Sequence, residues 1–200
     1  MALRQLRIKT LTELQGALIP LVLRGKHVIA HAETGSGKSF GIALAIANRV
    51  LRDSVNYRLH TLILVPTEEL ALQYEKWFIH FGSGTSQVVQ VAIDSIPLEQ
   101  QLAKLHNVAP HILVGTPSRI AAINHLSVSI IGEKLRRKVD CLVLDEADLI
   151  LQSTNLHGTR CRTGAELVDR LFRTHVDEIP AQMVAISATM DGRTARTLNT

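Results

Sequence analysis

The stretch Ala32-Glu-Thr-Gly-Ser-Gly-Lys-Ser39 lies between a short apolar run, His27–Ala30, and a segment, Phe40–Leu51, whose apolar residues recur at helical spacing. A glycine-rich turn that joins a strand to a helix is the setting that a phosphate-binding P-loop requires. Gly35 and Gly37 allow the backbone to curl with its amides pointing inward, and the start of the helix adds partial positive charge there. The sequence therefore predicts a P-loop after the first strand.

Individual residues of this loop have predicted roles in nucleotide binding. Lys38 is expected to bridge the β- and γ-phosphates, and the Ser39 hydroxyl to ligate Mg²⁺. Ala32 stands where the most familiar form of the motif has Gly, and a small residue there preserves the turn. A glycine-rich turn that binds nothing is the alternative, which the flanking strand and helix disfavour. The predicted nucleotide-binding residues of the loop are Ala32, Glu33, Thr34, Gly35, Ser36, Gly37, Lys38 and Ser39.

Short apolar runs rich in β-branched residues recur along the chain, with helical patterns between most of them. Such alternation implies right-handed crossovers and a parallel sheet with helices on both faces. A continuous apolar stretch such as Cys141–Leu144 fits a strand that is buried on both sides. We therefore predict an α/β fold with a doubly wound, mostly parallel sheet. After His27–Ala30, the expected strands are Thr61–Val65, Val88–Ile93, His111–Val114, Val139–Leu144 and Gln182–Ile186.

Composition is that of one globular unit. The chain has 200 residues, of which 46% are hydrophobic and 20% charged, and this length suffices for a core without disulfides or metals. The net charge of +4 allows a polyanionic partner but does not demand one. The nine histidines show no metal-binding spacing, so Mg²⁺ with nucleotide is the only metal expected. Two stretches, Gly82–Ser86 and Ser153–Gly164, are predicted to be surface loops with little to bury.

Cysteine usage and hydropathy indicate the environment of the protein. Cys141 and Cys161 do not form a C-x-x-C pair, and Cys141 lies in an apolar run where a buried thiol is expected. This favours a reducing compartment over a disulfide scaffold or a zinc site. No apolar run approaches the roughly 18 residues that a membrane span needs, and the first residues lack a secretory apolar region. We expect a soluble, intracellular protein without a membrane partner.

Asp145-Glu-Ala-Asp148 directly follows the predicted strand Val139–Leu144. Phosphoryl transfer needs a carboxylate at the end of a buried strand next to the P-loop. Asp145 is expected to hold the hydration shell of Mg²⁺, and Glu146 to act as general base or to position the attacking water. Acidic residues also cap helices, but that alternative is weak for these residues in this place. Glu146, Asp145 and Lys38 are therefore the candidate catalytic residues.

With Asp-Glu-Ala-Asp spelled out, the chain resembles the first, RecA-like domain of the DEAD-box ATP-dependent RNA helicases over almost all of its length. Leu11-Thr-Glu-Leu-Gln15 is similar to the adenine-reading Q motif of that family, which implies nucleotide contacts by Thr12 and Gln15. An amide that pairs with the adenine edge rejects guanine, so the expected nucleotide is ATP. Leu11 stands where the family usually has proline, and the stacking aromatic of the family would precede residue 1.

Three further segments resemble family motifs: Pro66-Thr-Glu-Glu-Leu70, Thr116-Pro-Ser-Arg119 and Ser187-Ala-Thr189. The first two resemble P-T-R-E-L and T-P-G-R, which grip the RNA backbone, and the third resembles the motif that couples the ATP and RNA sites. The departures are Glu68 for arginine, Ser118 for glycine, and Asp94 at about the place of a Gly-Gly motif. The resemblance implies RNA contacts by Pro66, Thr67, Thr116, Pro117 and Arg119. It implies coupling through Ser187, Ala188, Thr189 and Asp148.

Taken together, the resemblance implies an RNA-stimulated ATPase that remodels RNA or ribonucleoprotein. Its RNA contacts would be independent of base sequence and sensitive to salt. We expect residues 1–200 to be one ATP-binding domain that is incomplete at both ends and lacks the second RecA-like domain, its expected partner. The alternative is a remodelled domain that acts as a structural or assembly factor in a ribonucleoprotein complex. A P-loop ATPase unrelated to nucleic acid is disfavoured by the joint presence of these motifs.

Two groups outside these motifs have plainer interpretations. Leu70, Tyr74 and Trp77 recur at helical spacing after the second motif, so they are predicted to pack in the core together with Phe78. The basic cluster within residues 134–138 could touch nucleic acid, but a solvated edge before a strand is the more common case.

Overall fold

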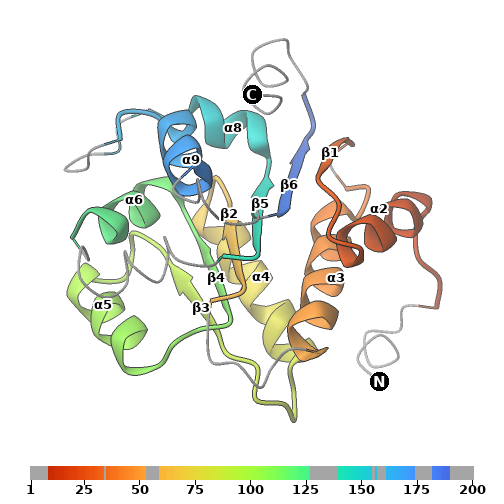
Figure 1. Ribbon diagram of the computed structural model, residues 1–200, viewed down its shortest axis with the longest axis horizontal. Coiled ribbons are helices and arrows are strands. Elements are labelled where there is room, and N and C mark those ends of the chain that lie inside the picture. Colours follow the sequence, from red (N-terminus) through yellow and green to blue (C-terminus); the bar gives the residue numbers. More distant parts are fainter. Residues whose placement is uncertain are drawn as a thin grey trace.

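The structure is a computed structural model that describes residues 9–33, 35–52, 59–126, 139–154, 156, 161–173 and 182–189. Within these residues, six parallel strands form one sheet in the order β1-β6-β5-β2-β4-β3 (Figure 1). This confirms the predicted parallel sheet, and each strand ends within two residues of its predicted bounds. The strands are β1 (Val28–His31), β2 (Thr61–Leu64), β3 (Val89–Ala92), β4 (Ile112–Gly115), β5 (Cys141–Asp145) and β6 (Gln182–Ser187).

Helices cover both faces of the sheet (Figure 1). One face is covered by α2 (Glu13–Leu23), α3 (Lys38–Arg52) and α4 (Glu68–Phe81). The other face is covered by α5 (Leu98–Asn107), α6 (Pro117–Leu126), α8 (Ala147–Gln152) and α9 (Gly164–Arg173). The doubly wound prediction is therefore confirmed.

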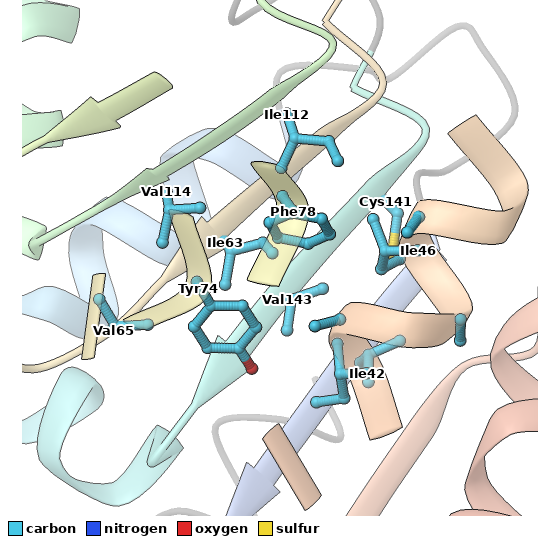
Figure 2. Packing of buried hydrophobic residues seen from close by; sticks show 14 of the residues in the cluster. Ile42, Ile46, Ile63, Val65, Tyr74, Phe78, Ile112, Val114, Cys141 and Val143 are labelled. Atoms are coloured by element: carbon cyan, nitrogen blue, oxygen red, sulfur yellow. The ribbon is translucent and has the colours of Figure 1, made fainter. Parts of the chain in front are cut away.

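Successive residues of the central strands enter opposite cores. Val143 of β5 packs with α3 and α4, while Leu142 and Leu144 pack in the core beneath α6, α8 and α9. Figure 2 shows Val143 beside Ile63 and Phe78 in the first of these cores. Fully burying one such side chain contributes roughly 1.5–3 kcal/mol. Apolar residues on both faces of the central strands are thus explained by helices that cover both sides of the sheet there.

The described residues of the segment 153–164 are more buried than predicted. Leu156 and Cys161 are each only 5% exposed and belong to the second core, and Thr154 pairs with Thr163 in an antiparallel bridge. The prediction of a loop with little to bury was therefore wrong. It rested on the many polar residues of the segment and gave too little weight to its two apolar residues. A Cβ on Gly164 would lie 1.8 Å from the carbonyl oxygen of Ile150, so only glycine allows this close approach.

Several smaller predictions are also settled by burial. Cys141 is 1% exposed, and burial raises the pKa of its thiol to about 12, which confirms an inert buried cysteine. Phe78 is 1% exposed and Trp77 packs against the same core, as predicted. The basic cluster within residues 134–138 lies outside the described residues. In the part of the chain that the structure describes, no helix is long and apolar enough to cross a membrane.

Candidate nucleotide and nucleic-acid site

The predicted motifs gather at the C-terminal edge of the sheet. The P-loop follows β1, residues 66–67 follow β2, and Thr116 follows β4, while Asp145 ends β5 and Ser187 ends β6 (Figure 1). In the sheet, β6 lies between β1 and β5, so the P-loop and Asp145 flank the segment that follows β6. Ligands of open parallel sheets bind at this edge.

The P-loop has the backbone that its glycines predict. Gly35 and Gly37 have φ of 85° and 80°, in the left-handed region that favours glycine. The Ser36 amide donates to the carbonyl oxygen of Glu33 at 3.3 Å. Lys38, the first residue of α3, donates from Nζ to the same carbonyl at 3.3 Å and is 4% exposed. The loop therefore curls back on itself, and the Lys38 ammonium lies across it.

Both ends of the P-loop contact other site residues. The Ala32 amide donates to the Ser187 carbonyl at 3.1 Å, which ties the start of the loop to the end of β6. At the other end, the Gly37 carbonyl accepts from Gln15 Nε2 at 3.0 Å, and Ser39 follows in the first turn of α3. Thr34 lies outside the described residues.

Thr12 and Gln15 join the start of α2 to the P-loop. They form a capping box, in which the Gln15 amide donates to Thr12 Oγ1 at 3.3 Å and the Thr12 amide donates to Gln15 Oε1 at 3.0 Å. Gln15 Nε2 donates to the Gly37 carbonyl at 3.0 Å, and Thr12 Oγ1 to that of Ser36 at 3.3 Å. A primary amide has two N–H donors and two lone pairs. The Gln15 side chain therefore keeps one donor and one acceptor, the pair that an adenine edge needs.

Asp145 is fully buried and has an unforeseen partner. The Tyr74 hydroxyl donates to Asp145 Oδ2 at 2.8 Å, and both residues are 0% exposed. Burial, and then the charge of Asp145, raise the pKa of Tyr74 well above its usual value, so the hydroxyl stays a donor. The core prediction for Tyr74 is confirmed, but it missed this polar contact. A tyrosine at a position where phenylalanine would also pack was the signal in the sequence.

Glu146 has a left-handed backbone at the start of α8. Its φ of 60° and ψ of 55° are uncommon for a residue with a side chain, and such a conformation costs about 1–3 kcal/mol. Burial and then the charge of Asp145 raise the pKa of the Glu146 carboxyl, while the charge of Lys38 opposes this shift. The Glu146 carboxyl is thus within electrostatic range of both the carboxylate at the end of β5 and the P-loop lysine. No residue pattern in the sequence predicts this strain.

The structure brings Asp148 to the segment that follows β6. Thr189 donates from its hydroxyl to Asp148 Oδ2, and its amide donates to Ser187 Oγ at 3.1 Å. Burial would raise the pKa of Asp148, but hydrogen bonds from Ser187, Thr189 and nearby backbone amides outweigh it and lower the pKa. The carbonyl of Ala188 accepts from His31 Nε2 at 2.7 Å. The predicted coupling residues therefore contact one another and the end of β1.

The predicted RNA-contacting residues after β4 surround a carboxylate. Asp94 Oδ2 accepts from Thr116 Oγ1 at 3.0 Å and from Ser118 Oγ at 2.6 Å. The guanidinium of Arg119 lies 3.3 Å from Asp94 Oδ1, donates to the Asp94 carbonyl at 2.9 Å, and is largely buried. Asp94 and Ser118, two of the departures from the family pattern, are thus partners of each other. In this structure the charge of Arg119 is already balanced.

The other RNA-facing residues begin helices or contact the same loop. Thr67 caps α4 by accepting from the Leu70 amide at 3.2 Å. Pro117 is the first residue of α6, where its missing N–H is tolerated, and Pro66 is half-buried before α4. Glu68 accepts at Oε1 from the Ser95 amide at 2.8 Å. The acidic side chain that replaces arginine therefore satisfies a backbone donor next to Asp94.

Solved structures show the same fold. The structure of Mss116p bound to ssRNA and AMP-PNP has a TM-score of 0.81 and 25% sequence identity, covering 99% of this chain and 39% of that chain. A hypothetical ATP-dependent RNA helicase from Sulfolobus tokodaii has a TM-score of 0.77 and 23% identity, with coverage of 99% and 52%. The similarity to Mss116p confirms the predicted RecA-like architecture of this family.

Sequence comparison also identifies ATP-dependent RNA helicases as relatives of this chain. ATP-dependent RNA helicase DBP8 of Mycosarcoma maydis is 36% identical over 155 residues, which are 76% of this chain and 28% of that protein. Probable ATP-dependent RNA helicase DDX47 of Homo sapiens is 43% identical over 143 residues, 70% of this chain and 29% of that protein. The chain thus spans less than a third of the length of these relatives. Because the DEAD/DEAH box helicase family model also matches residues 12–198, the chain belongs to the DEAD/DEAH box helicase family.

Proposed function

We propose that this chain is the ATP-binding RecA-like domain of an RNA-stimulated ATPase that remodels RNA or ribonucleoprotein. The observation that carries the proposal is that the Lys38 ammonium, held across the P-loop, and the buried Asp145 carboxylate, followed directly by Glu146, lie at the same edge of the sheet. A phosphate-binding lysine, a metal-binding carboxylate and a water-positioning carboxylate are the parts that phosphoryl transfer needs at one place. The relatives named above are ATP-dependent RNA helicases, and Mss116p was solved with AMP-PNP.

Each residue has a distinct task in the proposed site. Lys38 and the amides of the P-loop bind the phosphates, and Glu146 orients the attacking water. Ser39 and Asp145 would hold Mg²⁺, which supplies charge neutralisation at the phosphates. Asp145 Oδ1 fits this task because it is buried and has no hydrogen-bond partner among the described residues, so it can accept from metal-bound water.

Gln15→Ala is expected to reduce the preference for ATP over GTP. The variant removes the donor and acceptor that we assign to adenine, and it also removes the contact with Gly37. We expect a general loss of affinity together with a fall in the ATP:GTP ratio by about tenfold or more. Competition of both nucleotides against a fluorescent ATP analogue measures the ratio. The matched control is Thr12→Val, which loses the hydrogen bond from Thr12 to the Ser36 carbonyl but keeps the side-chain amide of Gln15. An unchanged ATP:GTP ratio in Gln15→Ala would contradict the recognition of adenine by Gln15.

RNA is the proposed second ligand, held through its sugar–phosphate backbone. Thr67 and Thr116 lie where α4 and α6 begin, and helix N-termini supply amides for phosphate oxygens. Asp94 and Glu68 add negative charge to the same face. Binding should therefore be independent of base sequence and sensitive to salt, and this domain alone should bind weakly.

Glu68→Arg is expected to strengthen RNA binding. The change replaces a carboxylate by the cation that the family has at this place, and one added phosphate contact should steepen the salt dependence of single-strand binding by roughly 0.7 in log–log slope. Fluorescence anisotropy with a labelled single-stranded RNA at several salt concentrations measures both quantities. Glu75→Arg on the same helix makes the same charge change away from the loop. Equal gains in both variants would show a general charge effect and refute a local contact.

A second RecA-like domain is the proposed intramolecular partner, because the arginine finger that completes the ATP site is expected from it. Without such a finger, hydrolysis should be slower by about 10³-fold or more. Ribonucleoprotein proteins are further proposed partners. The second candidate function is a structural or assembly factor that does not turn over ATP. The Asp94–Arg119 ion pair favours it, because Asp94 binds the guanidinium that would otherwise be expected to contact RNA.

Strand release from a short RNA duplex separates the two candidates. The protein used is this domain joined to the second RecA-like domain. Separation of a labelled RNA duplex is followed by gel or fluorescence under three conditions: with ATP, with a non-hydrolysable ATP analogue, and without nucleotide. The amount of duplex exceeds the amount of protein, so that repeated strand release can be detected. An RNA remodelling enzyme releases strands repeatedly only with ATP. Binding of RNA and ATP without repeated release would support the assembly factor and overturn the enzyme.

A further inference from the structure

A hydroxyl group reaches the end of β5 from within the hydrophobic core. Figure 2 shows the Tyr74 ring among the apolar side chains of the core, with its oxygen at the edge of the cluster. That oxygen donates to Asp145 Oδ2 at 2.8 Å. Apolar packing alone does not require the hydroxyl, since phenylalanine has the same ring. The contact therefore calls for an explanation at Asp145 and not in the core.

The Tyr74 ring is held in place by its neighbours. Trp77 packs edge-on against it with ring centroids 5.5 Å apart, and Phe78 stacks on it at 6.0 Å. All three residues belong to α4, whose N-terminus is fixed by the Thr67 cap. Because the ring is already immobilised, its hydroxyl holds a partner with little further loss of side-chain entropy.

The two oxygens of Asp145 are in different situations. Oδ2 is bound to Tyr74, whereas Oδ1 is buried and has no hydrogen-bond partner within the described part of the chain. A buried carboxylate oxygen without a donor is unfavourable, so this one is suited to a donor that arrives with the ligand. Ser39, the other expected magnesium ligand, lies in the first turn of α3.

We propose that Tyr74 is a positioning residue of the ATP site, whose hydroxyl fixes Asp145 Oδ2 so that Oδ1 faces the magnesium–nucleotide complex. The inference rests on the proposed ATP-binding function. A carboxylate free to rotate about its χ2 bond would present Oδ1 correctly for only part of the time, and preorganised ligands bind with a smaller entropic loss. Tyr74 thus acts through Asp145 and does not touch the nucleotide.

Tyr74→Phe tests the proposal because it keeps the ring and removes only the hydroxyl. Binding of a fluorescent ATP analogue is measured by titration with Mg²⁺ and in excess EDTA, and the ratio of the two dissociation constants gives the magnesium enhancement. We expect the enhancement to fall by about tenfold, as for loss of a hydrogen bond to a charged group, while affinity in EDTA stays the same. Half-saturation in Mg²⁺ at fixed nucleotide should shift upward.

Two further variants distinguish positioning from stability. Leu105→Ala shortens a buried side chain in the core on the other face of the sheet, away from Tyr74, and should lower the unfolding temperature but leave the magnesium enhancement intact. Asp145→Asn should lose the enhancement as Tyr74→Phe does. An unchanged magnesium enhancement in Tyr74→Phe, or equal losses of nucleotide affinity with Mg²⁺ and in EDTA, would overturn this inference and leave the proposed function standing. If the unaltered protein shows no magnesium-dependent nucleotide binding, the proposed function itself fails, and this inference with it.

Discussion

Lys38→Ala is expected to abolish measurable ATP binding. The lysine begins α3, is 4% exposed and donates across the P-loop to the Glu33 carbonyl, so its charge is held where two phosphates would meet. Each hydrogen bond from a charged group contributes about 1.5–3 kcal/mol, and the loss of two corresponds to an affinity more than roughly 100-fold lower. Titration of a fluorescent ATP analogue measures the loss.

The matched control for this variant is Lys104→Ala. Lys104 is an exposed lysine of α5, on the other side of the sheet from the P-loop helix. Its loss makes the same change in net charge and should leave nucleotide affinity unchanged. If Lys38→Ala folds normally and binds ATP within a few-fold of the unaltered chain, the P-loop assignment is wrong.

Glu146→Gln is expected to keep ATP binding and to block turnover. The amide has the same shape as the carboxyl but cannot accept a proton, and general-base catalysis contributes about 10²–10⁴-fold. We therefore expect a fall in kcat of at least 100-fold with little change in nucleotide affinity. Steady-state hydrolysis with RNA, in the form that carries both RecA-like domains, measures kcat; fluorescence titration measures affinity.

Glu75→Gln provides the comparison for Glu146→Gln. Glu75 lies on α4, and its side chain has no role in the proposed chemistry. Both variants remove one negative charge, so a charge effect alone would lower both rates. Unchanged turnover in Glu146→Gln would remove Glu146 from the chemistry and leave Asp145 as the candidate.

Much of the fold follows from local sequence patterns. The strand at 61–64 and the helix from Lys38 were predicted closely because a strand buried on both faces is continuously apolar, and because a P-loop occurs only between a strand and a helix. The positive φ of Gly35 agrees with the curled backbone that was predicted for this loop. Patterns of this kind depend on neighbours in the sequence, so one chain is enough to recognise them.

The contacts that were missed join residues far apart in the sequence. Tyr74 and Asp145 meet because residues of α4 and β5 share the core on one face of the sheet, and Asp94 and Ser118 meet because β3 and β4 are adjacent strands. Neither pairing leaves a local pattern, and Tyr74 was predicted only as an apolar core residue. The left-handed backbone of Glu146 is also invisible in the sequence, because asparagine or glycine is the usual sign of such a conformation.

The departures at Glu68 and Ser118 are better understood from the structure than from the sequence. Glu68 stands where the family has arginine, and it accepts a hydrogen bond from the Ser95 amide. Ser118 stands where the family has glycine, and its hydroxyl donates to Asp94. Each polar substitution therefore has an internal partner, which favours a stable domain whose RNA face is less positive than the family motif implies.

The most direct test is the rate of ATP hydrolysis with and without single-stranded RNA, measured on this domain joined to the second RecA-like domain, with Glu146→Gln as the background. We expect RNA to raise the rate in the unaltered protein and to leave the Glu146→Gln rate at background. A rate that does not respond to RNA, with ATP binding retained, would contradict an RNA-stimulated motor and favour the assembly factor.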